Sequence, residues 1–358
     1  MGGRPLPAGA AHARRDRGQS RGLDRGLDRR HAAGMSNPRC PICGRATSRL
    51  LISAPDYRMD DARRYPVWVC PHCGAGVTAT AMWGEAQRRA AYAGDYEPHQ
   101  GASRPARGWR GRLAATVRTG FGYPQLEALP LPKFLTRGLA RVRGWTWMPP
   151  PPPPGRLLDV GCGSGAYGAS LIRLGWQVEG VEPDAGAAAR ARQQGVRVQQ
   201  TSVEQASLPE GAYDVITLWH ALEHLDSPVA ALRTLRGALR EDGRLIVEVP
   251  NRAGWGARVL GAFWYHWDLP RHRVHFTPAS LRLALDVAGF QVERLAHIPN
   301  PHGLAGGLAY RFGRPGLARH PMLLALGWLF GLTAALARRG DVIRAVASVK
   351  EAGAPRDG

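Results

Sequence analysis

Short apolar runs alternate with helix-like segments along the second half of the chain. The apolar runs, bounded by glycine, proline or charged residues, have the length of buried strands. This regular alternation predicts an α/β fold with a seven-stranded, mostly parallel sheet. The expected strands lie near residues 156–160, 176–182, 196–200, 213–218, 243–249, 290–298 and 342–350, and the expected helices near 165–174, 184–194, 227–240 and 278–288.

A glycine-rich turn follows the first expected strand. The strand contains the acidic Asp159, and glycine then occupies every second position, at Gly161, Gly163 and Gly165. Glycine adopts positive φ readily, and it lets a ligand approach the backbone because it has no Cβ. The helix after the turn points its N-terminal amides into the same space. The segment therefore predicts a nucleotide-type cofactor site at the carboxyl end of a parallel strand.

A second acidic residue ends the next expected strand. Glu182 follows Gly161 by about 20 residues, where a carboxylate can accept hydrogen bonds from both ribose hydroxyls. The glycine spacing is G-x-G-x-G, whereas dinucleotide-binding turns read G-x-G-x-x-G. On these residues alone, a redox Rossmann protein remains the alternative.

The chain from about residue 155 to 350 resembles the class I S-adenosylmethionine-dependent methyltransferases. Residues 212–225 are similar to the fourth strand of that class and its substrate-facing loop, and residues 243–251 are similar to its fifth strand. Residues 269–281, which read LPRHRVHFTPASL, are similar to a segment of one bacterial branch that mostly acts on small molecules. The resemblance implies a Rossmann-like fold whose last strand inserts antiparallel between the fifth and sixth. Residues 301–341 would then be a helical insertion near the substrate mouth.

The resemblance also assigns cofactor roles to individual residues. The glycine turn would shape the methionine pocket, Glu182 would hold the ribose, and the residues after the third strand would contact adenine. Cys162 lies within the turn, where it reads as a small packing residue rather than a nucleophile. The predicted set for binding S-adenosylmethionine is Asp159, Gly161, Cys162, Gly163, Gly165, Glu182, Ser202, Val203, Glu204 and Trp219.

Methyl transfer from a sulfonium is an in-line displacement with an excellent leaving group, so the protein mainly positions the acceptor. A base is required where the acceptor must lose a proton, and histidine titrates near neutrality. His220 is the first candidate because it follows the fourth strand, where the acceptor should lie. Each candidate could instead hydrogen-bond the loop backbone. The candidate bases are His220, His224, His272 and His275.

His220, Glu223 and His224 form an H-x-x-E-H arrangement. A similar Glu-His pair binds a divalent metal in some quinone-pathway O-methyltransferases, but the acidic partners that usually precede it are absent from this sequence. The same letters occur in inverted zinc proteases, and the methyltransferase pattern around them argues against that reading. We therefore do not favour a metal at this motif.

Residues 263–268 are dense in aromatic side chains and lie close to two arginines. Aromatic walls with a few polar groups suit a sugar, polyketide or phenolic ring, and Arg271 and Arg273 could hold a phosphate or carboxylate. The alternative is an aromatic cluster that packs a lid onto the sheet.

Four of the five cysteines form two C-x-x-C-G pairs, and the spacing predicts a zinc-ribbon-like module over residues 35–80. Four thiolates close the coordination sphere of zinc, so the metal would be structural. Disulfides or a redox dithiol are the alternatives. The module could contact substrate, hold a carrier or brace the catalytic domain. The predicted zinc ligands are Cys40, Cys43, Cys70 and Cys73.

The remaining segments complete the expected organisation. Residues 1–34 hold little to bury, which predicts a disordered basic extension, either inert or preceding the authentic start at Met35. Residues 81–148 would be a helical cap, residues 149–155 a polyproline spacer, residues 156–350 the catalytic domain, and residues 351–358 a tail.

The formal net charge of +20 invites a nucleic-acid reading. The basic residues are nearly all arginine, however, and arginine, alanine, glycine and proline are abundant together, as in proteins from high-GC genomes. No apolar run reaches the ~20 residues of a membrane span, and residues 322–337 favour a packed helix over shallow membrane contact. We expect a cytoplasmic protein.

These patterns favour an enzyme that methylates an oxygen or carbon of a small molecule, such as a sugar, secondary metabolite or quinone-like ring. The acceptor could be anionic or bound to a carrier. The first alternative is an RNA methyltransferase that grips its substrate with the zinc module and arginines. The second is a non-catalytic protein that only binds S-adenosylmethionine.

Overall fold

The computed structural model describes residues 37–59, 61–79, 92, 108–125 and 127–350. All of these belong to one compact unit, residues 37–358. The predictions for the 1–34 extension, for the 351–358 tail and for most of residues 81–107 lie outside the described residues.

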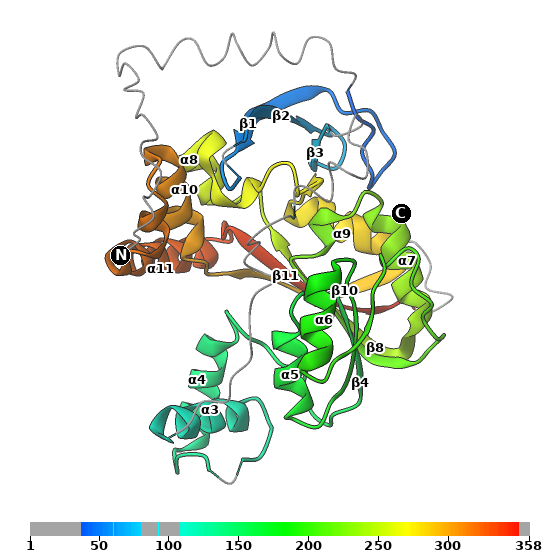
Figure 1. Ribbon diagram of the computed structural model, residues 1–358, viewed down its shortest axis with the longest axis vertical. Coiled ribbons are helices and arrows are strands. Elements are labelled where there is room, and N and C mark those ends of the chain that lie inside the picture. Colours follow the sequence, from blue (N-terminus) through cyan, green and yellow to red (C-terminus); the bar gives the residue numbers. More distant parts are fainter. Residues whose placement is uncertain (1–36, 60, 80–91, 93–107, 126, 351–358) are drawn as a thin grey trace, which may run out of the picture. The chain divides into compact units, whose positions relative to one another are not determined.

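A seven-stranded sheet has the order β10-β11-β8-β7-β4-β5-β6 (Figure 1). β11 runs antiparallel to both of its neighbours, and the other pairings are parallel. This is the predicted Rossmann-like class I methyltransferase sheet, in which the last strand along the chain, β11, lies between β8 and β10. The strands are β4 Arg156–Val160, β5 Gln177–Val181, β6 Arg197–Gln199, β7 Tyr213–Trp219, β8 Leu239–Pro250, β10 Phe290–Ile298 and β11 Val342–Val349.

Helices cover both faces of this sheet, which is why its central strands are apolar at consecutive positions. Leu158 of β4 packs in a core cluster with Leu232 and Leu281, whereas the adjacent Leu157 packs in another cluster with Leu171 and Ala191. Two helix starts are fixed by side chains that accept backbone N–H bonds, Asp184 and Thr277. The helices are α5 Ala166–Ile172, α6 Ala185–Gln193, α7 Pro228–Ala238, α8 Trp255–Leu260 and α9 Pro278–Val287, with 3-10 turns at Leu222–His224, Gly261–Phe263 and Tyr265–Trp267.

β8 begins earlier than the sequence predicts. Leu239 already pairs with Tyr213 of β7, and after a register shift the pairing resumes between Arg244 and Val215. The charged residues 240–242 and Gly243 resemble a loop, but they lie within the extended strand.

The four cysteines belong to a second sheet, of order β1-β2-β3-β9. β1 Arg49–Asp56, β2 Asp61–Val69 and β3 Gly76–Thr78 come from the N-terminal segment, whereas β9 Val274–His275 follows β8 of the main sheet along the chain. The four-cysteine module is therefore completed by a strand that lies about two hundred residues further along the sequence.

Within the described residues, the helices α3 Gly108–Gly120 and α4 Lys133–Arg143 precede the main sheet. The proline run that follows is packed against the domain: Pro149 and Pro150 are buried, and the Tyr123 hydroxyl donates to the Pro150 carbonyl at 2.6 Å. The predicted polyproline spacer over residues 149–155 thus packs against the domain at its first two prolines.

Residues 301–341 hold α10 His302–Phe312, a 3-10 turn Pro315–Arg319 and α11 Pro321–Leu336. Among the helices of the described residues, none has both the length and the apolar character needed to cross a membrane.

Candidate functional site

A cleft of about 1010 Å³ lies at the carboxyl ends of β4 and β7. Its floor contains Asp159, the glycine turn, Trp219 and His220. Its walls come from α3, from residues 143–148, from Ile298 to His302 and from α11. The predicted cofactor turn and the predicted acceptor loop therefore meet in one cavity, which has the size of a site for a cofactor and a small second ligand.

The glycine turn has the backbone that the sequence predicts. Gly161, Gly163 and Gly165 have φ values of +69°, +53° and +78°, which side chains with a Cβ rarely adopt. A Cβ on Gly165 would lie 2.7 Å from Cα of Ala191, so glycine also permits α5 to pack closely on α6. The turn is anchored to β5 because the Gly161 amide donates to the Val181 carbonyl at 2.8 Å.

Asp159 presents a buried carboxyl group to the cleft. Its Oδ1 accepts a hydrogen bond from the Thr217 hydroxyl at 2.7 Å. Burial raises the pKa of Asp159 to about 7; the Thr217 hydrogen bond opposes this shift, and the nearby charge of Glu182 adds to it. A cationic group placed beside Asp159 would therefore be strongly favoured, because it would neutralise a carboxylate that is costly to bury.

Glu182 supports the glycine turn from beneath. Its Oε2 accepts from the Gly163 amide at 2.9 Å, and its Oε1 accepts from the Asp184 amide at 2.9 Å. Glu182 is 4% exposed and does not line the cleft. In this structure it orders the turn, and its contact with a ribose stays a prediction.

The predicted adenine contacts lie after β6, apart from the cleft lining. Val203 is buried in the core, Ser202 is partly buried in a turn, and Glu204 is exposed. Val203 is therefore a packing residue, because its side chain faces the core. Adenine binding by Ser202 and Glu204 stays a prediction.

Cys162 behaves as the packing residue that the sequence suggests. A Cβ on Gly180 would lie 2.6 Å from its Sγ, so the thiol fills the space that this glycine leaves. Burial raises the pKa of the Cys162 thiol far above its usual range, and a protonated thiol is a poor nucleophile.

His220 occupies the point where β7 opens into the cleft. Its backbone has φ of +51°, a left-handed conformation that is unusual for histidine, and its amide donates to the Glu248 carbonyl at 3.0 Å. Its ring nitrogens lie between two carboxylates: Nδ1 is 3.2 Å from Glu223 Oε1, and Nε2 is 3.3 Å from Glu248 Oε1. The His220 side chain is 39% exposed and so reaches the cleft.

The two carboxylates keep His220 charged. Burial lowers its pKa, but the hydrogen bonds and charges of Glu223 and Glu248 outweigh burial and raise the pKa to about 10. At neutral pH, His220 is therefore an imidazolium and has no free lone pair to accept a proton. His220 lines the cleft, and its position beside the acceptor stays a prediction. The raised pKa argues against the predicted role of a neutral base at neutral pH.

The sequence analysis did not identify Glu248 and Arg344 as residues of the cleft. Arg344 forms a buried ion pair with Glu248, with Nε 2.6 Å from Oε2, and its Cζ lies 4.9 Å from the Trp219 ring centroid. Its other nitrogens donate to the carbonyls of Gly144 and Trp145. The sequence did contain one signal. Glu248 interrupts the apolar end of β8, Arg344 interrupts the apolar β11, and the two charges are opposite in sign.

The other three candidate bases point away from the cleft. His224 Nδ1 is 2.9 Å from the Tyr92 hydroxyl, His272 Nδ1 is 2.9 Å from the His266 carbonyl, and His275 Nε2 is 2.9 Å from the Thr78 hydroxyl. Burial lowers the pKa of all three, and that of His275 falls to about 3. They are neutral histidines that pack the four-cysteine module, so a role as cleft base is wrong for them.

The H-x-x-E-H motif is also divided. His220 faces the cleft, while His224 packs edge-on to His272 at 4.6 Å between ring centroids. Glu223, His224 and His272 offer donor atoms within 4.8 Å of one another, but His220 is not part of this group. The motif therefore does not act as one metal site.

The tryptophans of the aromatic segment 263–268 pack against the small four-stranded sheet and α8. Trp264 and Trp267 are 1% and 4% exposed and lie in a cluster with Tyr65 and Val67 of β2. The aromatic wall of the cleft comes from elsewhere, and sequence analysis did not find it. It consists of Trp109, Trp145, Trp147, Tyr167, Trp219 and Trp328.

Arg271 and Arg273 do not offer an anion site. Arg271 is fully buried and contacts both oxygens of Asp56, at 2.7 and 2.8 Å, as well as Asp268 at 2.7 Å. Arg273 pairs with Asp226 at 2.7 Å. These guanidinium groups hold the protein's own carboxylates, so the prediction that they bind a substrate phosphate is wrong.

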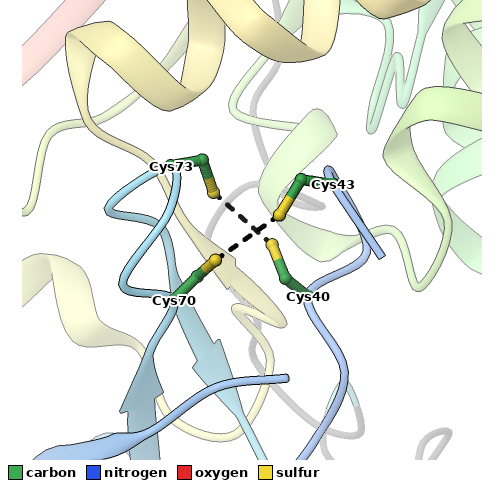
Figure 2. A group of neighbouring side chains, drawn as sticks. All are labelled: Cys40, Cys43, Cys70 and Cys73. Atoms are coloured by element: carbon green, nitrogen blue, oxygen red, sulfur yellow. Dashed lines mark hydrogen bonds between the residues drawn. The ribbon is translucent and has the colours of Figure 1, made fainter. Parts of the chain in front are cut away.

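The four predicted zinc ligands converge (Figure 2). Cys40 Sγ lies 3.5 Å from Cys73 Sγ, Cys43 Sγ lies 3.4 Å from Cys70 Sγ, and all four sulfurs are within 4.8 Å of one another. These separations exceed a disulfide bond of about 2.05 Å and approach the spacing of about 3.7 Å expected around tetrahedral zinc. Each pair is followed by a glycine with positive φ, Gly44 or Gly74, which closes the turn.

Residues 130–295 match a family described as a methyltransferase domain. With the strand order and the glycine turn at β4, this match identifies a methyltransferase domain with the class I fold within residues 130–295. Its curated relatives include the ubiquinone biosynthesis O-methyltransferases of Aeromonas salmonicida, 32% identical over 40% of this chain and 66% of that protein, and of Xanthomonas euvesicatoria, 34% identical over 38% and 63%. The chain thus spans just under two thirds of the length of these relatives.

Among solved structures, a possible histamine N-methyltransferase from Thermotoga maritima is similar at 20% identity. The alignment covers 56% of this chain and 84% of that one, with a TM-score of 0.40.

Proposed function

We propose that the protein transfers the methyl group of S-adenosylmethionine to an acidic hydroxyl, such as a phenol, of a small molecule. The observation that carries this proposal is the cleft in which Asp159 and the glycine turn face Trp219 and His220. The ubiquinone-pathway relatives, which are named as O-methyltransferases, support transfer to oxygen.

The residues of the cleft fit the cofactor. Asp159 offers a buried carboxylate for the cationic amino group of the methionine moiety. The turn at Gly161 and Gly163 lets the ligand approach the backbone, and Glu182 fixes that turn through the Gly163 amide. When bound, S-adenosylmethionine supplies an electrophilic methyl group on a sulfonium.

The charge of His220 points to the kind of acceptor. An imidazolium beside the acceptor oxygen lowers the pKa of a bound hydroxyl, because the positive charge stabilises the oxyanion. A phenol, with an ordinary pKa near that of tyrosine at about 10, ionises under this influence, whereas an aliphatic alcohol does not. The released proton leaves through the open cleft, and His220 keeps its own proton throughout.

Replacing His220 should therefore change the pH profile as well as the rate. In the wild type, kcat/KM for catechol should fall as pH rises through about 10, where His220 loses its charge. His220→Asn keeps a residue that tolerates positive φ but removes the charge. It should lower kcat/KM by about 100-fold near pH 8 and abolish the alkaline decline. Transfer of radiolabelled methyl groups measures both effects.

Two controls make this test specific. His320→Asn, on an exposed histidine outside the cleft, should leave the profile unchanged. Cyclohexane-1,2-diol, which lacks an acidic hydroxyl, should not be methylated. Methylation of the diol at a rate similar to catechol, or an unaltered profile in His220→Asn, would overturn the role given to His220.

We further propose that Cys40, Cys43, Cys70 and Cys73 bind a structural zinc ion. Four thiolates fill its coordination sphere and leave no position for water. Support comes from the convergence of the sulfurs and from the way the module joins the rest of the chain. β3 pairs with β9, and Arg271 contacts Asp56 at the end of β1. The module therefore braces the segment that carries His272 and His275.

A further inference from the structure

Three helices beside the cleft pack with their small residues inward and their large apolar residues outward. Most surface helices do the reverse, because burying apolar side chains is what holds a helix on a domain. In α4 the buried residues are Thr136 and Ala140, while Phe134 is 72% exposed and Val142 is 55% exposed. This arrangement leaves an apolar helix face without a partner among the described residues.

α4 shows the pattern most clearly. Leu135, Leu139 and Val142 are spaced four and three residues apart, so they share one side of the helix. That side is turned to solvent, since all three are at least 37% exposed. The opposite side packs against α3, where a Cβ on Gly120 would meet the backbone of Thr136.

α3 and α11 repeat the arrangement. α3 buries Ala115 and Thr116 and exposes Trp109 by 70%. α11 buries Gly327, Gly331 and Ala334, and a Cβ on Gly327 would meet the Pro301 carbonyl oxygen at 2.3 Å. The large side chains of α11 that remain exposed are Met322, Leu326, Leu329 and Leu336.

All charged side chains of these three helices are basic. α3 and α4 contain no acidic residue, and α11 contains no charged residue at all. Arg338 and Arg339 directly follow α11, and both are exposed. The basic residues of α3 and α4 are Arg110, Arg112, Arg118, Lys133, Arg137, Arg141 and Arg143.

All three helices contribute residues to the lining of the cleft. Trp109 and Leu113 of α3 and Leu324 and Trp328 of α11 all line it. Trp145, which follows α4, lies 6.2 Å from Trp328 between ring centroids. A surface that covered these helices would therefore also border the entrance to the candidate active site.

We propose that the exposed faces of α3, α4 and α11 form a docking surface for an anionic lipid bilayer. Apolar side chains flanked by arginine and lysine are what an interfacial helix needs: the apolar groups enter the acyl boundary and the basic groups contact anionic head groups. α11 has 16 residues, or about 24 Å of helix, which is shorter than the roughly 30 Å of a bilayer core. It suits attachment in the plane of the membrane.

Charge favours this occupant over a second copy of the chain. Two copies that met through these helices would bring cationic surfaces together, and like charges in contact oppose association. A nucleic acid would neutralise the arginines but would leave Phe134, Leu135 and Val142 in contact with water or phosphate. An anionic bilayer satisfies both the charge and the apolar face.

The docking surface also predicts the kind of acceptor molecule, and this prediction rests on the proposed function. A cleft that opens against a bilayer receives an amphiphilic acceptor that partitions into lipid. Vesicle binding requires no methyl transfer, so the docking surface can be tested whether or not the proposed chemistry is right.

The test is co-sedimentation of the full-length protein with vesicles of phosphatidylcholine alone or of phosphatidylcholine and phosphatidylglycerol at 3:1. The wild type should bind the anionic vesicles at least tenfold more tightly. Arg137→Glu with Arg141→Glu should weaken this binding by about 25-fold, because each basic residue near an anionic surface contributes roughly fivefold. Phe134→Ser with Val142→Ser should weaken it by about tenfold.

A matched control carries the same chemical changes elsewhere. Val287→Ser with Arg197→Glu alters an exposed apolar residue and an exposed arginine outside these helices, and it should bind vesicles as the wild type does. Circular dichroism spectra and thermal melting curves check that every variant keeps its fold. Equal binding to both vesicle types, an equal loss in the control, or concentration-dependent dimerisation abolished by Phe134→Ser with Val142→Ser would overturn the proposal.

Discussion

Removing one thiolate of the four-cysteine group should unfold the N-terminal module. We expect purified wild-type protein to hold one zinc ion per chain and the Cys70→Ser variant to hold almost none. Structural zinc supplies on the order of 10 kcal/mol to small domains of this kind, and β1 to β3 bury few large apolar residues of their own. Hydrogen exchange should show that β1 and β2 lose protection, while β4 and β7 stay protected.

The fifth cysteine provides the matched control for this prediction. Cys162 is buried beside Gly180, outside the four-cysteine group, and Cys162→Ala should keep both the zinc and the protection of β1 and β2. Wild-type protein that is folded without zinc, or a Cys70→Ser variant with unchanged exchange in β1 and β2, would contradict a structural metal.

The Arg271→Met variant should lose about 3–5 kcal/mol of unfolding free energy at pH 7. The Arg271 side chain is fully buried between Asp56 and Asp268, which are 4% and 6% exposed. Removing the guanidinium takes away a cation that two buried carboxylates share, although Asp268 still faces Arg58 at 3.2 Å. The loss of charge compensation in a buried pair is far costlier than a lost surface contact. Urea denaturation monitored by tryptophan fluorescence measures the change.

The pH dependence of this effect has a definite sign. Burial raises the pKa of Asp268, but the charges of Arg271 and Arg58 outweigh burial and hold it well below its usual range. The stabilisation is therefore present above the unfolded pKa of about 3.9 and is lost as pH falls through the folded value. The gap between wild type and Arg271→Met should narrow as pH falls from neutral, because burial raises the pKa of Asp268 once Arg271 is gone, and the variant therefore takes up a proton before the wild type does.

An exposed ion pair provides the comparison for Arg271. Arg244 pairs with Glu293 at 2.9 Å, with side chains 42% and 37% exposed, and Arg244→Met should cost no more than about 1 kcal/mol. A loss in Arg271→Met as small as this would mean that the buried pairs do not join the four-cysteine module to the rest of the protein.

Local patterns explain why so much of the fold could be predicted. The strands of the main sheet are short apolar runs, and the glycine turn and the paired cysteines each specify a backbone geometry that few other residues allow. Asp159, Gly161 and Gly163 were found for that reason. The convergence of Cys40, Cys43, Cys70 and Cys73 could be predicted because two C-x-x-C-G pairs have the spacing of metal ligands.

The features that the sequence did not predict depend on pairings between distant parts of the chain. Glu248 and Arg344 contact each other only because β11 inserts beside β8 in one register, in which the two residues are opposite. His272 and His275 lie in a segment that is similar to one of a bacterial methyltransferase branch and were therefore candidate bases, but β9 pairs with β3 and both histidines are buried. The charge of His220 likewise follows from two carboxylates whose approach the sequence does not reveal.

The most direct test of the central claim is calorimetric titration of S-adenosylmethionine and S-adenosylhomocysteine into wild-type protein, Gly163→Arg and Gly237→Arg. Gly163 lines the cleft with φ of +53°, so arginine there would both strain the turn and fill the methionine pocket. Gly237 is an exposed glycine of α7 with no atom within 4 Å of an added Cβ. We expect micromolar binding by the wild type and Gly237→Arg, and a loss of about 1,000-fold in Gly163→Arg. Folded, zinc-loaded wild type that binds neither compound, or equal binding by all three proteins, would contradict a cofactor site at the glycine turn.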